Sequence, residues 1–245
     1  MTSRLIVPLD YPELPIALEI ADRLCTAVDW FKIGKELFTS VGPSSVQSLK
    51  KTGKSVFLDL KFHDIPNTVS GAVASATKLG ADMINVHASG GLEMMQAASL
   101  SAMDQADKLN IAKPKLLAVT VLTSIDQFAF ARDLNSSRSL SAQVVYLAQL
   151  AQKAGLDGVV ASPLEIEKIR RACGNDFWIV TPGIRPRQSV ISDQKRIMSP
   201  AEAIDAGADQ LVIGRPITKS DDPLKVTHEI LTEMRSPQKS VSQTE

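Results

Sequence analysis

The chain has 245 residues, 44% of them hydrophobic, which is long enough to bury a large core without disulfides or structural metals. Its 27 lysines and arginines balance its 27 aspartates and glutamates, which excludes the broadly basic surface that binds nucleic acid or an anionic membrane. Apolar runs stay well short of the roughly 20 residues that a membrane-spanning helix needs.

Short apolar runs alternate with amphipathic segments along the chain, a pattern typical of βαβ units and a parallel sheet. Strands are predicted at residues 5–9, 30–33, 56–60, 83–86, 116–121, 158–161, 178–181 and 210–213. Helices are predicted at residues 15–24, 44–51, 67–79, 92–109, 141–154, 164–171, 200–206 and 223–234. The pattern predicts a single-domain α/β protein, a (β/α)8 TIM barrel over residues 1–235. Residues 236–245, polar and without apolar periodicity, are predicted to be a disordered tail.

Three predicted helices end in a similar phrase, and each phrase contains a glycine and a closing aspartate. The phrases are Gly80-Ala81-Asp82, Ala154-Gly155-Leu156-Asp157 and Gly207-Ala208-Asp209. Glycine readily adopts the left-handed conformation that stops a helix. We interpret the three phrases as one kind of helix-to-strand turn, used three times.

Two features bear on the location of the protein. Cys25 and Cys173 are far apart in the sequence and lack metal-ligand spacing, which indicates free, buried thiols in a reducing compartment. Residues 1–10 have the pattern of a strand and a turn rather than of a cleavable leader. A cytoplasmic location is therefore expected.

Polar residues follow the predicted strands, at the rim where the catalytic groups of this fold collect. They are Asp10, Lys32, Asp59 with Lys61, His87, Thr123, Ser162, Pro182 with Arg185, and Gly214 with Arg215. A face that served only stability would have no reason to gather these groups. Because the first three strands are neighbours in a barrel, we expect Asp10, Lys32, Asp59 and Lys61 to lie within reach of one another.

The third predicted strand leads into the run Asp59-Leu60-Lys61-Phe62-His63-Asp64-Ile65-Pro66-Asn67-Thr68. The two-residue period of a strand places Asp59 and Lys61 on one face, with Asp64 in the loop beyond. Two carboxylates around one ammonium at the end of a parallel strand are more often catalytic than structural. A solvated salt-bridge cluster is the alternative interpretation.

This decapeptide resembles the signature of the orotidine 5'-phosphate decarboxylase family, which converts orotidine 5'-phosphate to uridine 5'-phosphate. Further matching segments follow in the order of that family, at residues 7–10, 31–34, 121–124, 181–186 and 213–218. The Asp-x-Lys-x-x-Asp spacing alone also occurs in related barrel enzymes. The continuation Ile65-Pro66-Asn67-Thr68 and the later Pro-Gly-Ile-Arg-Pro segment make the resemblance specific.

The resemblance implies decarboxylation without a metal or an organic cofactor. Loss of CO2 from C6 of the pyrimidine leaves a carbanion that the ring cannot delocalise, so the enzyme must lower the barrier by roughly 20 kcal/mol, largely by electrostatic preorganisation. Lys61 is expected to stabilise this carbanion and then to protonate it as general acid. Asp59 is expected to position Lys61, since its repulsion of the departing carboxylate, about 4 kcal/mol, is too small to account for the rate.

The expected catalytic residues are Lys61, Asp59, Asp64 and Lys32. Asp10 and Lys32 are expected at the ribose hydroxyls, although a turn-capping role is the alternative for Asp10. The resemblance also implies a homodimer with shared active sites, in which Asp64, Ile65 and Thr68 reach the other subunit. The full expected substrate-binding set is Asp10, Lys32, Asp59, Leu60, Lys61, Phe62, His63, Asp64, Ile65, Pro66, Asn67, Thr68, Thr123, Pro182, Arg185, Gln194, Gly214 and Arg215.

The substrate phosphate is expected at the loops after the seventh and eighth strands, the standard phosphate site of this fold. Gly214 permits close backbone approach, and the guanidinium of Arg215 fits phosphate oxygens. Arg185 and Gln194 lie in the long segment 183–199, which is long enough to close over a ligand. A mobile basic surface loop is the alternative interpretation of this segment.

Other functions stay open at this point. His63 and His87 lack a compact ligand set, so no metal site is expected, and His87 is interpreted as a rim residue. A related barrel enzyme, a ketogulonate-phosphate decarboxylase or hexulose-phosphate synthase, would act on a sugar phosphate and depend on magnesium. A catalytically silent barrel could bind a nucleotide as a regulator, but binding alone would not require Lys61, Asp59 and Asp64 together.

Overall fold

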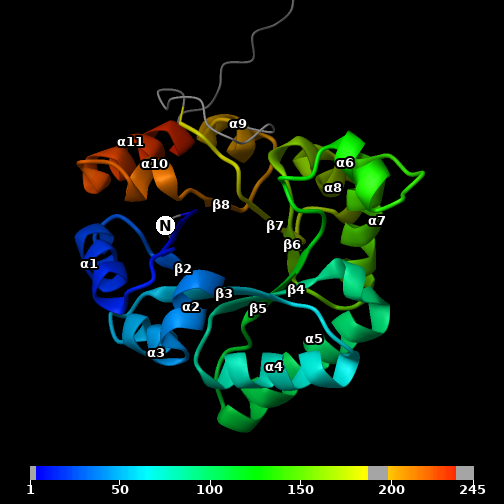
Figure 1. Ribbon diagram of the computed structural model, residues 1–245, viewed down its shortest axis with the longest axis horizontal. Coiled ribbons are helices and arrows are strands. Elements are labelled where there is room, and N and C mark those ends of the chain that lie inside the picture. Colours follow the sequence, from blue (N-terminus) through cyan, green and yellow to red (C-terminus); the bar gives the residue numbers. More distant parts are fainter. Residues whose placement is uncertain (1–3, 187–197, 236–245) are drawn as a thin grey trace, which may run out of the picture.

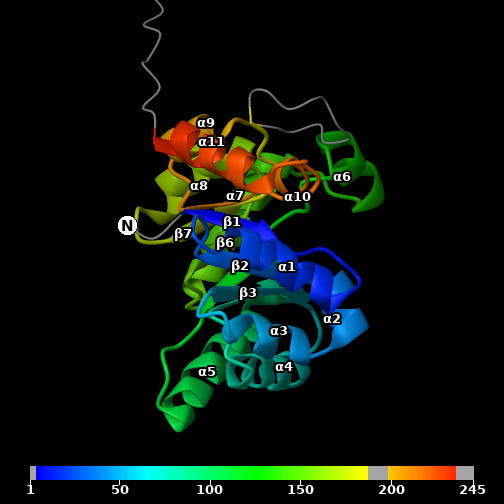
Figure 2. The same ribbon diagram turned by 90° about the vertical axis from the view of Figure 1, so that its left-hand side faces the viewer.

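The computed structural model describes residues 4–186 and 198–235 of the chain. Its strands form one closed barrel in the order β1-β2-β3-β4-β5-β6-β7-β8, and every neighbouring pair is parallel. The helices surround the strands, with α9 and α11 on one side of the barrel and α4 and α5 on the opposite side (Figures 1 and 2). The predicted (β/α)8 fold class is confirmed.

All eight predicted strands are present. They are β1 (Leu5–Pro8), β2 (Trp30–Gly34), β3 (Ser55–Phe62), β4 (Met83–His87), β5 (Lys115–Val119), β6 (Gly158–Val160), β7 (Trp178–Thr181) and β8 (Gln210–Val212). Two boundaries differ from the prediction by two residues, because β3 continues through Phe62 and β5 ends at Val119 rather than at residue 121; the other boundaries agree within one residue. Because of this extension, Lys61 belongs to strand β3 itself and not to the loop that follows it.

The helices include three that the sequence pattern did not predict. The α-helices are α1 (Leu14–Leu24), α2 (Lys35–Val41), α3 (Ser44–Lys50), α4 (Pro66–Lys78), α5 (Gly91–Leu109), α6 (Gln127–Asp133), α7 (Leu140–Lys153), α8 (Ile166–Cys173), α9 (Pro200–Asp205), α10 (Arg215–Thr218) and α11 (Pro223–Arg235), with 3-10 turns η1 (Ala88–Gly90) and η2 (Pro163–Glu165). The unpredicted helices are α2, α6 and α10. Each spans about two turns or fewer, which is too short for a helical apolar period to stand out.

The core has two layers because successive strand residues point to opposite faces. Ile6, Phe57, Met83, Leu117 and Val180 fill the inside of the barrel, and a larger cluster lies between strands and helices. Towards the carboxyl ends of the strands the inward-facing residues become polar. The next inward residue after Phe57 is Asp59, and the next after Met83 is Asn85. The apolar layer therefore forms the floor of a polar site at the carboxyl ends of the strands.

The three helix-to-strand turns take the predicted conformation. Gly80, Gly155 and Gly207 have φ angles of 84°, 80° and 105°, in the left-handed region that glycine tolerates. The prediction of one turn used three times is confirmed by this shared geometry.

Each turn leads into a strand, and the aspartate of the turn binds the strand that comes before that one in the barrel. Asp82 accepts hydrogen bonds from the Val56 amide at 2.7 Å and from Lys50 Nζ at 2.7 Å. In the same way, Asp157 accepts from the Leu116 amide and from Lys113, each at 2.8 Å. Each carboxylate thus joins two adjacent strands at the amino end of the barrel and is neutralised by a nearby cation.

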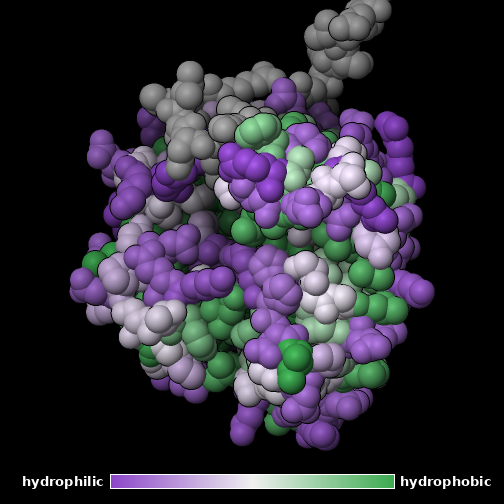
Figure 3. All heavy atoms as spheres, turned by 45° about the vertical axis from the view of Figure 1, so that its right-hand side comes forward, coloured by the Kyte–Doolittle hydropathy of each residue, from purple (hydrophilic) through white to green (hydrophobic). Residues whose placement is uncertain are grey.

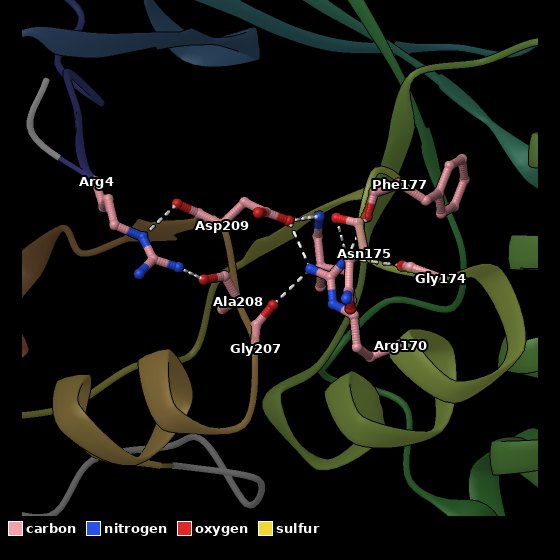
Figure 4. A network of polar contacts seen from close by, with 9 residues as sticks. Arg4, Arg170, Gly174, Asn175, Phe177, Gly207, Ala208 and Asp209 are labelled. Atoms are coloured by element: carbon pink, nitrogen blue, oxygen red, sulfur yellow. Dashed lines mark hydrogen bonds and ion pairs between the residues drawn. The ribbon is translucent and has the colours of Figure 1, made fainter. Parts of the chain in front are cut away.

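Asp209 belongs to the most extensive of these turns (Figure 4). Its carboxylate accepts from the Ile179 amide and from Arg170, each at 2.7 Å. Arg170 also donates to four backbone carbonyls, those of Gly174, Asn175, Phe177 and Gly207, at 2.6 to 2.9 Å. Arg4, next to β1, donates to the carbonyls of Ala208 and Asp209, so this network lies where the first and last strands close the barrel.

Cys173 is buried and Cys25 is half-buried, and both are free thiols, so Cys25 is more exposed than the sequence analysis expected. Among the described residues, no helix is both long and apolar enough to cross a membrane. Hydrophilic and hydrophobic residues are interspersed on the face shown in Figure 3. The predicted tail, residues 236–245, lies outside the described part of the chain.

We predict that Arg170→Ala lowers the free energy of unfolding by about 2 to 4 kcal/mol, because it removes charge-assisted bonds that join three segments. Urea denaturation measures the change. Arg171→Ala is the matched control: this neighbouring side chain is 78% exposed and makes one ion pair at 3.4 Å. Its removal should cost less than about 0.5 kcal/mol. Equal losses in the two variants would contradict the role assigned to Arg170.

Candidate functional site

A cavity of about 250 Å³ opens at the carboxyl ends of the strands. Its lining residues combine a charged wall with an apolar one and are Lys32, Phe57, Asp59, Lys61, Val119, Val121, Leu122, Thr123, Ser124, Val160, Ala161, Pro182 and Val212. The charged wall comes from β2 and β3, and much of the apolar wall comes from β5 and β6. Charges that border a largely apolar lining are less screened than charges in bulk water.

Four charged side chains alternate in sign in one row, which begins at Asp10 after β1 and continues along the charged wall. Lys32 Nζ lies 2.9 Å from Asp10 Oδ1 and 3.4 Å from Asp59 Oδ2. Lys61 Nζ lies 2.5 Å from Asp59 Oδ1. The structure thus brings Asp10, Lys32, Asp59 and Lys61 together, as expected from the order of the strands. We call these four residues the charge array.

Asp59 is the buried centre of the charge array, with 9% of its surface exposed. Burial alone would raise the pKa of its carboxyl, but Lys32, Lys61 and hydrogen bonds from Lys61 and Asn85 outweigh burial and hold the pKa below its ordinary value. Asp59 is therefore ionised at neutral pH. Its contribution to stability is present above the ordinary pKa and is lost as the pH falls through the lowered one.

Lys61 lies at an irregularity in β3. Leu58 pairs with Ile84 and Phe62 pairs with Val86, so β3 has extra residues between two pairs of the ladder. Lys61 has a φ angle of 55°, a conformation that costs a non-glycine residue about 1 to 3 kcal/mol. Asp59 and Lys61 lie on one face, as the sequence analysis expected: both line the cavity, while Leu60 and Phe62 pack outward. The bulge changes the pairing and the backbone conformation at Lys61 but keeps this alternation.

Asn85 on β4 completes the interior of the site and was missed by the sequence analysis. It is fully buried. Its Oδ1 accepts from the Lys61 amide at 2.8 Å, and its Nδ2 donates to Asp59 Oδ1 at 2.7 Å. The signal was present in the sequence: within the predicted strand 83–86, a two-residue period places Asn85 on the same inward face as Met83.

The loop after β3 lies apart from the charge array. Asp64, Ile65, Asn67 and Thr68 are exposed, and Ile65 keeps 66% of its surface in solvent. Asp64 Oδ1 accepts a hydrogen bond from the Ile65 amide at 2.7 Å. Within the part of the chain that the structure describes, Asp64 has no ion pair with Lys61, so a single chain does not bring the second carboxylate to the ammonium.

Several predicted binding residues do not line the cavity. Leu60 and Phe62 pack instead against the outer core, because they alternate with the inward residues of β3. His63 is exposed and Pro66 opens α4. Thr123 and Pro182, in contrast, both line the cavity as expected.

Three of the predicted phosphate-binding residues, Arg185, Gly214 and Arg215, follow β7 and β8. Gly214 precedes α10, and a Cβ atom at this position would lie 2.8 Å from Pro8 Cγ. Only glycine therefore lets the backbone lie this close to Pro8. Arg215 is exposed at the start of α10. The amide of Arg185 donates to the carbonyl of Met198 at 3.0 Å, which closes the base of the long segment. Gln194 lies outside the described residues.

His87 ends β4 at the rim, and its ring centroid lies 5.4 Å from that of His63. Burial first, and then the neighbouring His63, Lys61 and Lys35, lower the pKa of His87 from 6.5 to about 4. His87 is therefore neutral at physiological pH. In the described ranges, no three His, Cys, Asp or Glu side chains come together as a metal-binding group.

Comparisons with known proteins agree over nearly the whole chain. The family model described as "Orotidine 5'-phosphate decarboxylase / HUMPS family" matches residues 3–230. A curated relative named orotidine 5'-phosphate decarboxylase, from Moorella thermoacetica, is 50% identical over 95% of this chain and 92% of its own. One of the same name from Trichlorobacter lovleyi is 50% identical over 95% of both chains. The crystal structure of orotidine 5'-phosphate decarboxylase from Lactobacillus acidophilus covers 96% of this chain and 100% of its own, with a TM-score of 0.85 and 36% identity.

We predict that protonation of His87 destabilises the fold in acid. Because folding lowers its pKa from the ordinary 6.5 to about 4, the unfolded chain binds this proton more readily than the folded chain. The free energy of unfolding should fall as the pH drops from 6.5 towards 4, and His87→Gln should weaken that dependence in urea denaturation. His228→Gln, at an exposed position on α11, is the control. An unchanged pH dependence in His87→Gln would contradict the prediction.

Proposed function

The chain belongs to the orotidine 5'-phosphate decarboxylase / HUMPS family, and we propose that it decarboxylates orotidine 5'-phosphate to uridine 5'-phosphate in pyrimidine biosynthesis. The observation that carries the proposal is the placement of Lys61 Nζ, 2.5 Å from an ionised Asp59 and on the wall of a largely apolar cavity. An ammonium fixed there is suited to a reaction that develops negative charge on a ring carbon.

In the proposed reaction the bond between C6 and the carboxylate breaks, and its electron pair stays on C6 while CO2 leaves. The ammonium of Lys61 stabilises this carbanion and then transfers a proton from Nζ to C6, which forms the C–H bond of the product. Water afterwards returns a proton to the Lys61 amine. The charges balance without an electron acceptor, so the proposal needs no cofactor.

Asp59 and the apolar wall support this chemistry in different ways. Asp59 holds Nζ of Lys61 in place, because the carboxylate and the ammonium attract each other. Val119, Val160 and Val212 limit the water around the reacting carbon. The field of the ammonium is therefore only weakly screened where the carbanion forms.

The rest of the substrate is assigned to the rim of the barrel. Asp10, whose side chain is 51% exposed, and Lys32 offer an acceptor and a donor to the ribose hydroxyls. Gly214 and Arg215, supported by Arg185 and Gln194, are assigned to the phosphate, because a guanidinium fork matches phosphate oxygens. Thr123, in the cavity wall, is assigned to the pyrimidine ring.

The proposal includes a homodimer with shared active sites. Asp64, Ile65 and Thr68 are exposed in this chain, and Ile65 offers an apolar side chain for burial by a second copy. In an isologous dimer these residues reach the partner's cavity, where Asp64 supplies the second carboxylate beside Lys61. A cytoplasmic location is part of the same proposal and is supported by two free thiols, Cys25 and Cys173.

We predict that the purified protein converts orotidine 5'-phosphate to uridine 5'-phosphate at the same rate before and after EDTA treatment, in a spectrophotometric assay. Lys61→Ala should lower kcat by at least about 1,000-fold, because it removes both the stabilising charge and the proton donor. Lys225→Ala, at an exposed position on α11, is the control. Turnover of a ketogulonate or hexulose phosphate only with magnesium, and none of orotidine 5'-phosphate, would contradict the proposal.

A second prediction concerns the shared site. Lys61→Ala and Asp64→Ala chains should each be inactive alone, and mixing them should restore activity, because one site of every mixed dimer then carries neither change. With random exchange, half of the dimers are mixed, so activity should approach roughly a quarter of the wild-type value. Mass-tagged chains verify the exchange. Verified exchange with no regained activity would show that Asp64 serves its own chain.

A further inference from the structure

Asn85 is a buried polar residue that the proposed reaction does not use. It lies on the inner face of β4, between Met83 in the apolar layer and His87 at the rim. In the ladder between β3 and β4, Leu58 pairs with Ile84 and Phe62 with Val86. The three bulge residues 59–61 therefore stand opposite Asn85 alone.

The side-chain amide of Asn85 fills this gap in the ladder. Its Oδ1 accepts from the backbone amide of Lys61 at 2.8 Å, and its Nδ2 donates to Asp59 Oδ1 at 2.7 Å. Only this orientation satisfies both partners, because a backbone N–H donates and a carboxylate accepts. A carboxylate at position 85 would lack the donor, and an aliphatic side chain would lack both groups.

We propose that Asn85 is a positioning residue for the decarboxylation, which fixes Lys61 at both of its ends. The bond to the amide of Lys61 holds the left-handed backbone at φ 55°. The bond to Asp59 fixes the carboxylate that binds Lys61 Nζ at 2.5 Å. One side chain thus determines where the ammonium enters the cavity. The inference rests on the proposed function, because positioning has a kinetic consequence only if Lys61 acts on the substrate.

Asn85→Leu tests the proposal, because leucine has a similar size and forms no hydrogen bonds. We expect kcat to fall by about 100-fold, the effect of a misplaced catalytic group. The Kd for uridine 5'-phosphate should change little, since ribose and phosphate are bound elsewhere. Loss of binding with an unchanged kcat would overturn the proposal.

Gln210→Leu is the matched control. Gln210 is a buried amide on β8, on the same inward face as Val212, and its exposed fraction is 6%. Its replacement removes an amide from the barrel interior and leaves both bonds of Asn85 intact. We expect kcat close to that of the wild type. A loss as large as that of Asn85→Leu would assign the effect to barrel packing and overturn the proposal.

Asn85→Asp provides a pH signature that a purely structural role would not produce. The charged and titratable groups around this position are Asp59 and Lys61 on β3, Lys32 beyond Asp59 on β2, and His87 on β4. The nearest residues of β5 are apolar: Asn85 pairs with Leu117, and His87 pairs with Val119. Two adjoining carboxyl groups here would share one proton, whose apparent pKa is raised by their repulsion.

While that proton is present, the new carboxyl donates to Asp59 as the amide does. As the pH rises and the proton is lost, the two carboxylates repel one another and Asp59 no longer fixes Lys61. The ratio of variant to wild-type kcat should therefore fall as the pH rises for Asn85→Asp and stay constant for Asn85→Leu. Parallel profiles of Asn85→Asp and wild type would overturn the proposal. This test remains decisive if Asn85→Leu does not fold.

Carbon-13 NMR of the Asp59 carboxyl gives a readout that needs no substrate. Loss of the Nδ2 donor in Asn85→Leu should raise the pKa of Asp59, because the hydrogen bond stabilises the ionised form. An unchanged pKa would overturn the positioning role. If the wild-type protein did not decarboxylate orotidine 5'-phosphate while this pKa rose, the proposed function would fail and the contact made by Asn85 would stand.

Discussion

The carboxyl end of the barrel depends on one buried carboxylate held between two ammonium groups. Asp59 is 9% exposed, and it contacts Lys61 at 2.5 Å and Lys32 at 3.4 Å. An isolated charge at this depth would be strongly unfavourable, and removal of one partner of such a pair leaves the other uncompensated. Without Asp59, two lysines would lie close together on one wall of the cavity with no carboxylate between them. The carboxylate is therefore what allows two cations to be concentrated beside an apolar wall.

Aspartates have opposite roles at the two ends of this barrel. At the amino end, Asp82, Asp157 and Asp209 each bind the backbone amide of a neighbouring strand, and a nearby lysine or arginine neutralises each one. These carboxylates connect neighbouring strands. At the carboxyl end, Asp59 binds side chains and Lys61 takes a strained conformation. The strained conformation of Lys61 thus lies at the candidate site, at the opposite end of the barrel from these stabilising turns.

The sequence predicted the strands and the longer helices but missed three short helices, for reasons visible in particular residues. The predicted helix 92–109 matches α5, which has nineteen residues. A helix of this length repeats its apolar period several times, so the sequence pattern is enough to predict it. The seven-residue α6 has a single buried residue, Phe130, and its start depends on Asp126, whose side chain accepts from the Ala129 amide. A capping bond of this kind is specified by local geometry, so the residue type alone did not reveal it.

The sequence by itself determined the barrel, the order of its strands and the gathering of Asp10, Lys32, Asp59 and Lys61, because strand and helix periods are local and the ends of parallel strands share one rim. Only the tertiary structure decided that the backbone of Lys61 is left-handed and which residue holds it there. The bulge in β3 arises from its pairing with β4, and Asn85 is one more buried residue of a strand until that pairing is known. Contacts between strands depend on the register in which the strands pair. That register exists only in the assembled sheet, so the periodicity of a single strand does not predict it.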